Sequence, residues 1–165
     1  MTHVGSRSGK WPAGFTMIEL LVTVLMISVL AMAALPVVEI TVQRQKEQEL
    51  RRALREIREA LNTYKQAVED GRIQRKAGES GYPPDLETLV RGVPDLMDPK
   101  GGRLYFLRRI PRDPFAPDAR IPAAKTWGKR SYASSAEEPE EGADVFDVFS
   151  RSQAVGMNSV PYREW

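Results

Sequence analysis

The chain has 165 residues, of which 42% are hydrophobic, and it contains no cysteine and one histidine, His3. This length fits one domain. The lack of cysteine excludes disulfides, thiolate nucleophiles and cysteine-ligated zinc, and a catalytic triad or histidine-ligated metal would have to use a residue at the extreme N-terminus. The net charge of +2 equals the contribution of Arg7 and Lys10, which precede the hydrophobic run, so the remaining chain is neutral, which argues against nucleic acid as a partner.

The first predicted element is an uncharged hydrophobic segment, residues 20–38. At ~1.5 Å per residue, a helix of this length nearly crosses a ~30 Å hydrocarbon layer, so the segment is a candidate membrane span. An ordinary secretory signal peptide is the alternative, because basic residues precede the segment and Ala31-Met32-Ala33 forms a small-residue cleavage site. Two observations weigh against it. The helical pattern continues beyond Pro36, and the carboxylate of Glu19 stands at the edge of the apolar run, where a charge is costly.

The residues before this segment, Gly14-Phe15-Thr16-Met17-Ile18-Glu19, resemble the GFTxxE signal of type IV prepilins. In that family a prepilin peptidase cleaves after the glycine on the cytoplasmic side and methylates the new N-terminal residue. The resemblance therefore implies leader cleavage between Gly14 and Phe15, methylation of Phe15, and retention of the hydrophobic segment. In a bundle of such helices, the α-amino group of Phe15 would pair with the Glu19 carboxylate of a neighbouring subunit for assembly. The alternative for Glu19 is an interfacial acid that extends to water.

A long amphipathic helix is predicted beyond the apolar segment. Hydrophobic residues recur at spacings of three and four over residues 50–68 and form one stripe, and Gly71 follows as a stop signal, so the helix is expected to end near Glu69. Pro36 predicts a kink, with a helix end at the membrane surface as the alternative. A coiled coil over residues 43–69 is disfavoured because the stripe is short and later strand signals offer it a partner.

The rest of the chain predicts a small head. Residues 71–81 are polar and glycine-rich, which indicates an exposed connection, and residues 82–90 predict a short helix opened by proline. Strands are predicted at residues 102–109, 131–133 and 144–150. The predicted fold is therefore α+β, with a long N-terminal helix, membrane half plus amphipathic half, packed on a small antiparallel sheet.

Motifs in the head extend the resemblance over nearly the whole chain. Tyr82-Pro83, the stretch containing Asp113-Pro114-Phe115, residues 147–150 and Trp165 resemble the major, G-type pseudopilin of type II secretion. The Asp-Pro-Phe element also predicts a structural turn. Its proline restricts the backbone, its aspartate accepts backbone N–H bonds, and its phenylalanine fills the edge of the core.

The chain departs from this family where the family often binds calcium, after its phenylalanine-serine pair. Here Arg151 follows, and calcium requires several oxygen ligands including carboxylates. We therefore expect no metal and no cofactor, although Asp144, Asp147 and Glu164 could still contribute ligands. The acidic run at residues 137–141 could contact a partner or a cation, but a charge run interrupted by proline is more typical of a solvated loop.

The resemblance implies four regions: a leader at residues 1–14, a transmembrane and assembly helix at 15–38, the amphipathic part of the spine at 39–70, and the head at 71–165. It implies a structural filament subunit of a type II secretion pseudopilus, not an enzyme.

The implied location is the inner membrane, crossed once, with the head in the periplasm. The implied partners are copies of the same chain, minor pseudopilins, prepilin peptidase, the inner-membrane secretion platform and membrane lipid. The alternatives are a type IV pilus subunit for adhesion or motility, or a periplasmic domain behind an ordinary signal peptide.

Overall fold

The computed structural model describes residues 14–165, without the side chains of residues 33–38. It forms two compact units, divided between Val42 and Gln43. One long helix, α1 (Met17–Glu69), contributes to both units. The predicted leader lies outside the described residues except for Gly14.

In the first unit, α1 carries apolar side chains that contact no core. Every described side chain from Phe15 to Val42 is exposed, with Phe15 74% and Met17 82% accessible. Among the described residues, no helix combines the length and the apolar character needed to cross a membrane. The predicted span, residues 20–38, includes the six residues whose side chains are not described. The kink predicted at Pro36 falls among those six and stays a prediction.

In the second unit, α1 provides one wall of the head's core. Its buried residues recur every three or four positions, which confirms the predicted stripe: Leu50, Ala53, Leu54, Ile57, Ala60, Leu61, Tyr64, Ala67 and Val68. The helix ends at Glu69, as expected. Gly71 follows with φ of 73°, a left-handed conformation that glycine adopts without a steric penalty.

A short helix and a small sheet follow α1. α2 (Leu86–Arg91) is capped at its N-terminus by Asp85, whose side chain accepts the Thr88 N–H at 2.7 Å. β1 (Val93–Pro94) and β2 (Arg103–Leu104) pair antiparallel. Within the strand predicted at residues 102–109, only Arg103 and Leu104 are in a strand, and the prediction is wrong for the residues after them. The N–H groups of Phe106 and Leu107 both donate to the Leu89 carbonyl at the end of α2, so the chain leaves the strand direction after β2.

The second sheet pairs β3 (Trp127–Arg130) antiparallel with β4 (Asp147–Ser150). β4 lies within the predicted strand at residues 144–150. The strand predicted at residues 131–133 is wrong, because Asp144 accepts the Ser131 hydroxyl at 2.9 Å and the Tyr132 N–H at 2.8 Å and turns the chain away directly after β3. A 3-10 helix, η1 (Ala123–Thr126), precedes β3, and a second, η2 (Tyr162–Glu164), lies near the C-terminus.

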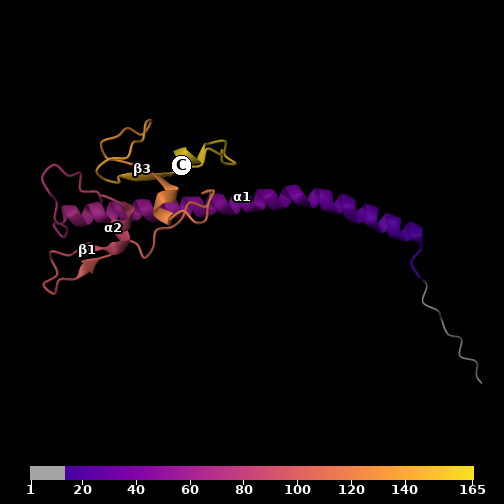
Figure 1. The fold of residues 1–165 in the computed structure, drawn as a ribbon, viewed down its shortest axis with the longest axis horizontal. Helices are drawn as coiled ribbons and strands as arrows, with labels where there is room; N and C mark the ends of the chain where they lie inside the picture. Colours follow the sequence, from indigo (N-terminus) through magenta and orange to yellow (C-terminus); the bar gives the residue numbers. More distant parts are fainter. Residues whose placement is uncertain (1–13) are drawn as a thin grey trace, which may run out of the picture. The chain divides into compact units, whose positions relative to one another are not determined.

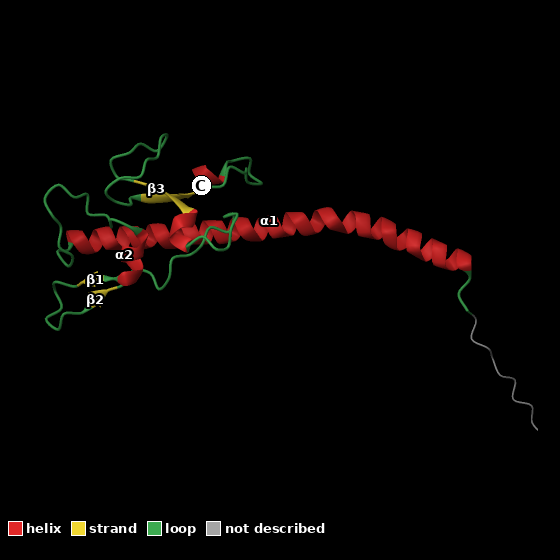
Figure 2. Cartoon of the chain, in the orientation of Figure 1, coloured by secondary structure: helices red, strands yellow, loops and turns green. Residues whose placement is uncertain are grey.

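The described chain is therefore α+β, with a long helix and two two-stranded antiparallel sheets in place of one. In the head, α2 and β1 lie on one side of α1, and β3 lies on the other (Figure 1). Loops make up most of the head apart from α1 (Figure 2). Its core is the cluster that includes Leu50, Ile57, Leu89, Trp127 and Val148.

Candidate functional site

The start of α1 contains the residues that sequence analysis singled out. Thr16 precedes the helix, and its hydroxyl accepts the Glu19 N–H at 3.3 Å while its carbonyl accepts the Leu20 N–H at 3.1 Å. Thr16 and Glu19 thus have the spacing of a capping box, in which threonine satisfies a free N–H at the helix start. Sequence analysis missed this role of Thr16, although Thr-x-x-Glu before an apolar run is the usual sequence signal of a capping box.

The Glu19 carboxylate is exposed and has no partner among the described residues. It lies in the first turn of α1, where the positive end of the helix dipole favours a negative charge. The neighbouring side chains are apolar and exposed, Phe15 just before the helix and the others within it: Met17, Ile18, Leu20 and Leu21. The segment therefore combines one free carboxylate with an uncovered apolar surface.

Nothing in the described part of the chain requires glycine at position 14. A Cβ atom added at Gly14 would meet no atom of residues 14–165 within 4 Å, and its φ is not in the left-handed region that favours glycine. A requirement for a small residue here would therefore have to come from outside these residues.

In the head, a buried carboxylate joins α1 to the C-terminal segment. Glu47 is 7% exposed, and its Oε1 accepts the Met157 N–H at 2.8 Å and the Tyr162 hydroxyl at 3.0 Å. Gln43 donates its side-chain N–H to the same oxygen at 3.4 Å. Burial raises the pKa of the Tyr162 hydroxyl, and Glu47 raises it further while Gln43 opposes the shift. Sequence analysis did not predict this cluster.

Two arginines of α1 hold the same C-terminal segment. The Arg58 side chain donates to Asp147 at 2.8 Å, to the Val148 carbonyl at 3.2 Å and to the Trp165 carbonyl at 2.8 Å. The Arg51 guanidinium lies 4.4 Å from the centre of the Trp165 ring, within the range of a cation–π contact. The C-terminal segment is therefore fixed to α1 at more than one point along the helix.

The Asp113-Pro114-Phe115 element forms a turn around a buried carboxylate. Asp113 is 1% exposed and accepts the Phe115 N–H at 2.8 Å and the Ser150 hydroxyl at 2.6 Å. The Asp113 N–H donates to the Thr126 hydroxyl at 3.2 Å. This one residue thus connects the turn to β4 and to η1.

The Tyr82-Pro83 pair lies against the loop that leads to β4. The Pro83 carbonyl accepts the Val145 N–H at 2.8 Å, and the Tyr82 ring meets the edge of Phe146 with centroids 5.0 Å apart. The pair therefore contributes to packing in the head.

We expect Phe115→Ala to destabilise the head by about 2 kcal/mol, less than the ~3 kcal/mol typical of a fully buried ring. The ring is only partly buried, but it stacks on Tyr162 with centroids 4.0 Å apart. Urea unfolding of the unit Gln43–Trp165 measures the change. Tyr105→Ala is the control, because that ring is 64% exposed and should change stability by less than ~0.5 kcal/mol. Equal effects of the two substitutions would contradict the prediction.

Two of the three acids considered as calcium ligands take part in other contacts, and the third, Glu164, is exposed in η2. Asp144 binds the turn after β3, and Asp147 pairs with Arg58 and Arg130. Arg151 donates to the Trp127 carbonyl at 3.0 Å and to Glu141 at 2.9 Å. Within residues 14–165, no group of three or more His, Cys, Asp or Glu side chains is arranged to hold a metal ion.

No protein-family model, curated protein or solved structure gave a significant match to this chain. Its function is therefore inferred from its residues, their geometry and the motif resemblance.

Proposed function

We propose that the chain is a structural subunit of a type II secretion pseudopilus, made as a membrane-inserted precursor and polymerised through its N-terminal helix. The observation that carries the proposal is the apolar surface of α1. A helix that is hydrophobic all round requires lipid or other apolar helices around it, and the described side chains up to Val42 have neither within the chain. The same helix continues into the head, so assembly of the helices would array the heads.

The GFTxxE motif supports this proposal over an ordinary signal peptide. α1 runs without interruption through Ala31-Met32-Ala33, the alternative cleavage site, and on to the head. Nothing among the described residues explains glycine at position 14, whereas a prepilin peptidase would require it. The proposed location is therefore the inner membrane, with the head in the periplasm, and the proposed partners are other copies of the chain, minor pseudopilins, the secretion platform and prepilin peptidase.

Processing tests the proposal directly. Mass spectrometry of the mature chain is expected to show methylated Phe15 at the N-terminus. Gly14→Leu should leave the full-length precursor in the membrane, and Gly14→Ala, which keeps a small residue, should still be cut. Because no described atom lies within 4 Å of a Cβ at this position, a clash with the described fold would not explain a block in Gly14→Leu. A mature N-terminus at Ala34 would instead establish an ordinary signal peptide.

A further inference from the structure

Three aromatic rings gather beside the turn after β3. Tyr82, Tyr132 and Phe146 contact one another, with centroid distances of 5.0 to 5.9 Å. Two rings already have a cation nearby in the same chain: Arg130 lies 4.7 Å from the Phe146 centroid, and Lys65 lies 5.8 Å from that of Tyr82. Tyr132 is 61% exposed, and no cation lies over its ring among the described residues. The cluster, which we call the aromatic patch, therefore leaves one ring face free for an external cation.

Unpaired carboxylates lie on the loop that follows Tyr132 of the aromatic patch in the chain. The loop at residues 134–142 follows the turn after β3 and returns beside that turn, because the Ser131 N–H donates to the Glu140 carbonyl at 2.9 Å. Glu137, Glu138 and Glu140 are exposed, and their carboxylates form no ion pair within the described chain. A free ring and adjacent carboxylates together favour guanidinium groups, which stack on aromatic faces and bind carboxylates in a planar, bidentate way.

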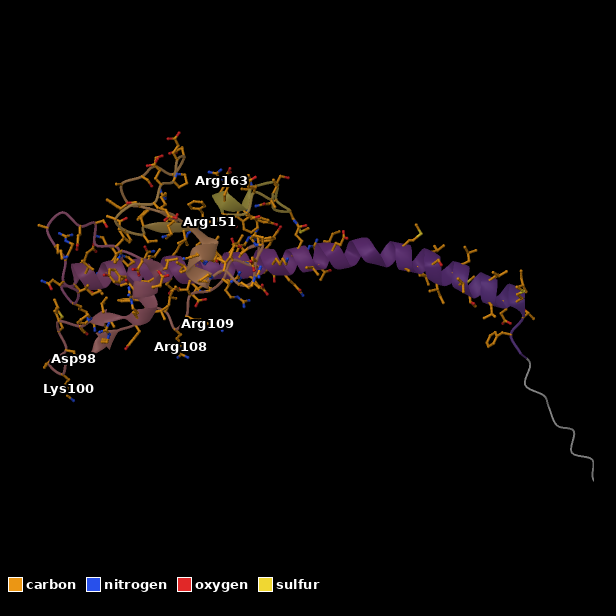
Figure 3. All side chains as sticks on the ribbon, in the orientation of Figure 1. Asp98, Lys100, Arg108, Arg109, Arg151 and Arg163 are labelled. Carbon is orange, nitrogen blue, oxygen red and sulfur yellow. The ribbon has the colours of Figure 1, made fainter. Side chains whose placement is uncertain are left out.

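The same chain displays a matching basic pair. Arg108 and Arg109 are both exposed, and within residues 14–165 neither forms an ion pair or a side-chain hydrogen bond. They border a groove along α1 with Glu56 and Glu59, but those carboxylates do not pair with them. Both arginines lie on one side of α1 in Figure 3, whereas β3 and the loop that follows it lie on the other side in the same orientation.

We propose that Arg108 and Arg109 of one copy bind the aromatic patch and the acidic loop of a second copy. The proposed partner is a second copy of the same chain, since it carries both halves of the contact on opposite sides of its head. An interface between two different surfaces is heterologous, and it repeats from copy to copy when the rotation does not close a ring. The inference rests on the proposed filament function and adds a head-to-head contact to the helix contacts of α1.

Paired charge reversals in the full-length chain test this contact. Arg108→Glu/Arg109→Glu is expected to lower multimers, crosslinked through lysines in the membrane, by about tenfold, as loss of two cation contacts predicts. Glu137→Arg/Glu138→Arg should have the same effect. Combining all four substitutions in one chain restores opposite charges and should recover part of the multimers, as should mixing the two reversed chains. The stacking on Tyr132 stays lost, because a carboxylate cannot replace the guanidinium there. No lysine is changed in any of these variants.

The aromatic part has its own variants. Tyr132→Ala should lower the amount of multimer severalfold, and Tyr132→Phe should not, because the ring face is kept.

Arg75→Glu/Arg163→Glu is the matched control for the charge reversals, since both arginines are exposed and the charge change equals that of Arg108→Glu/Arg109→Glu.

The outcomes separate this contact from the function on which it rests. The contact would be overturned if Arg108→Glu/Arg109→Glu and the control Arg75→Glu/Arg163→Glu gave equal amounts of crosslinked multimer. It would also be overturned if the chain with all four charge reversals recovered no multimer. If wild type forms multimers that Glu19→Ala abolishes while the head reversals have no effect, the contact fails and the filament function stands. Absence of multimers from processed wild-type chain would overturn both.

Discussion

Glu19→Ala is expected to leave membrane insertion and cleavage after Gly14 intact and to reduce filament formation by at least tenfold. The substitution removes a charge from the apolar end of α1, so insertion should be no harder than for wild type. In an assembly, however, an unpaired carboxylate among apolar helices is penalised, and pairing with the Phe15 amino group of the next subunit recovers part of that penalty. Only the correct axial register brings the two groups together.

Crosslinking between subunits, with cleavage checked by mass, separates these steps. Glu39→Ala is the matched control, because Glu39 is also an exposed acid on α1 but lies beyond the apolar run. Thr16→Val tests the local alternative, since it removes the hydroxyl that caps the Glu19 N–H while keeping the carboxylate. If Thr16→Val abolishes filaments and Glu19→Ala does not, the motif acts through helix capping, and the register argument is wrong.

Asp113→Ala is expected to cost the head about 3 kcal/mol, a large share of the 5–15 kcal/mol that stabilises a typical domain. The substitution leaves two donors, the Phe115 N–H and the Ser150 hydroxyl, without the acceptor that they have in the buried turn. Asp113→Asn keeps the shape and one acceptor oxygen, so it should cost roughly half as much.

Urea unfolding of the unit Gln43–Trp165 compares these variants. Asp118→Ala is the control, because its carboxylate pairs with Arg120, which is 92% exposed, and exposed pairs contribute ~0–1 kcal/mol. If the urea midpoint of Asp113→Ala equals that of Asp118→Ala, the Asp113 carboxylate does not stabilise the turn.

The part of the fold that could be predicted from the sequence is the part set by local periodicity. The stripe over residues 50–68 depends on spacing along one helix, and the end of α1 before Gly71 depends on one conformational preference. The strands depend on distant partners. β2 ends early because the Leu89 carbonyl accepts the N–H groups of Phe106 and Leu107. β3 is followed by a turn because Asp144 accepts hydrogen bonds from Ser131 and Tyr132. No local pattern contains those partners.

The same division applies to the candidate site. Gly14, Phe15 and Glu19 form a contiguous motif, so the sequence alone singled them out. From the sequence, Glu47 looks like one more charged residue on the exposed face of a helix. Its burial depends on hydrogen bonds from Met157, 110 residues later, and from Tyr162, 115 residues later. A charged side chain held by neutral donors from so far along the chain has no signature in sequence spacing.

The attachment of the C-terminal segment to α1 has a mechanical consequence. Gln43 and Glu47 lie where the head begins on α1, and Arg51 and Arg58 hold the same segment further along. A pulling force applied along α1 would therefore act on several contacts that are spread along the helix axis. These contacts would be loaded in shear at the same time and would share the force. A head fixed at one end alone would be peeled off one bond at a time. In the proposed filament, an axial pull on α1 would therefore be shared between the helix and the C-terminal segment.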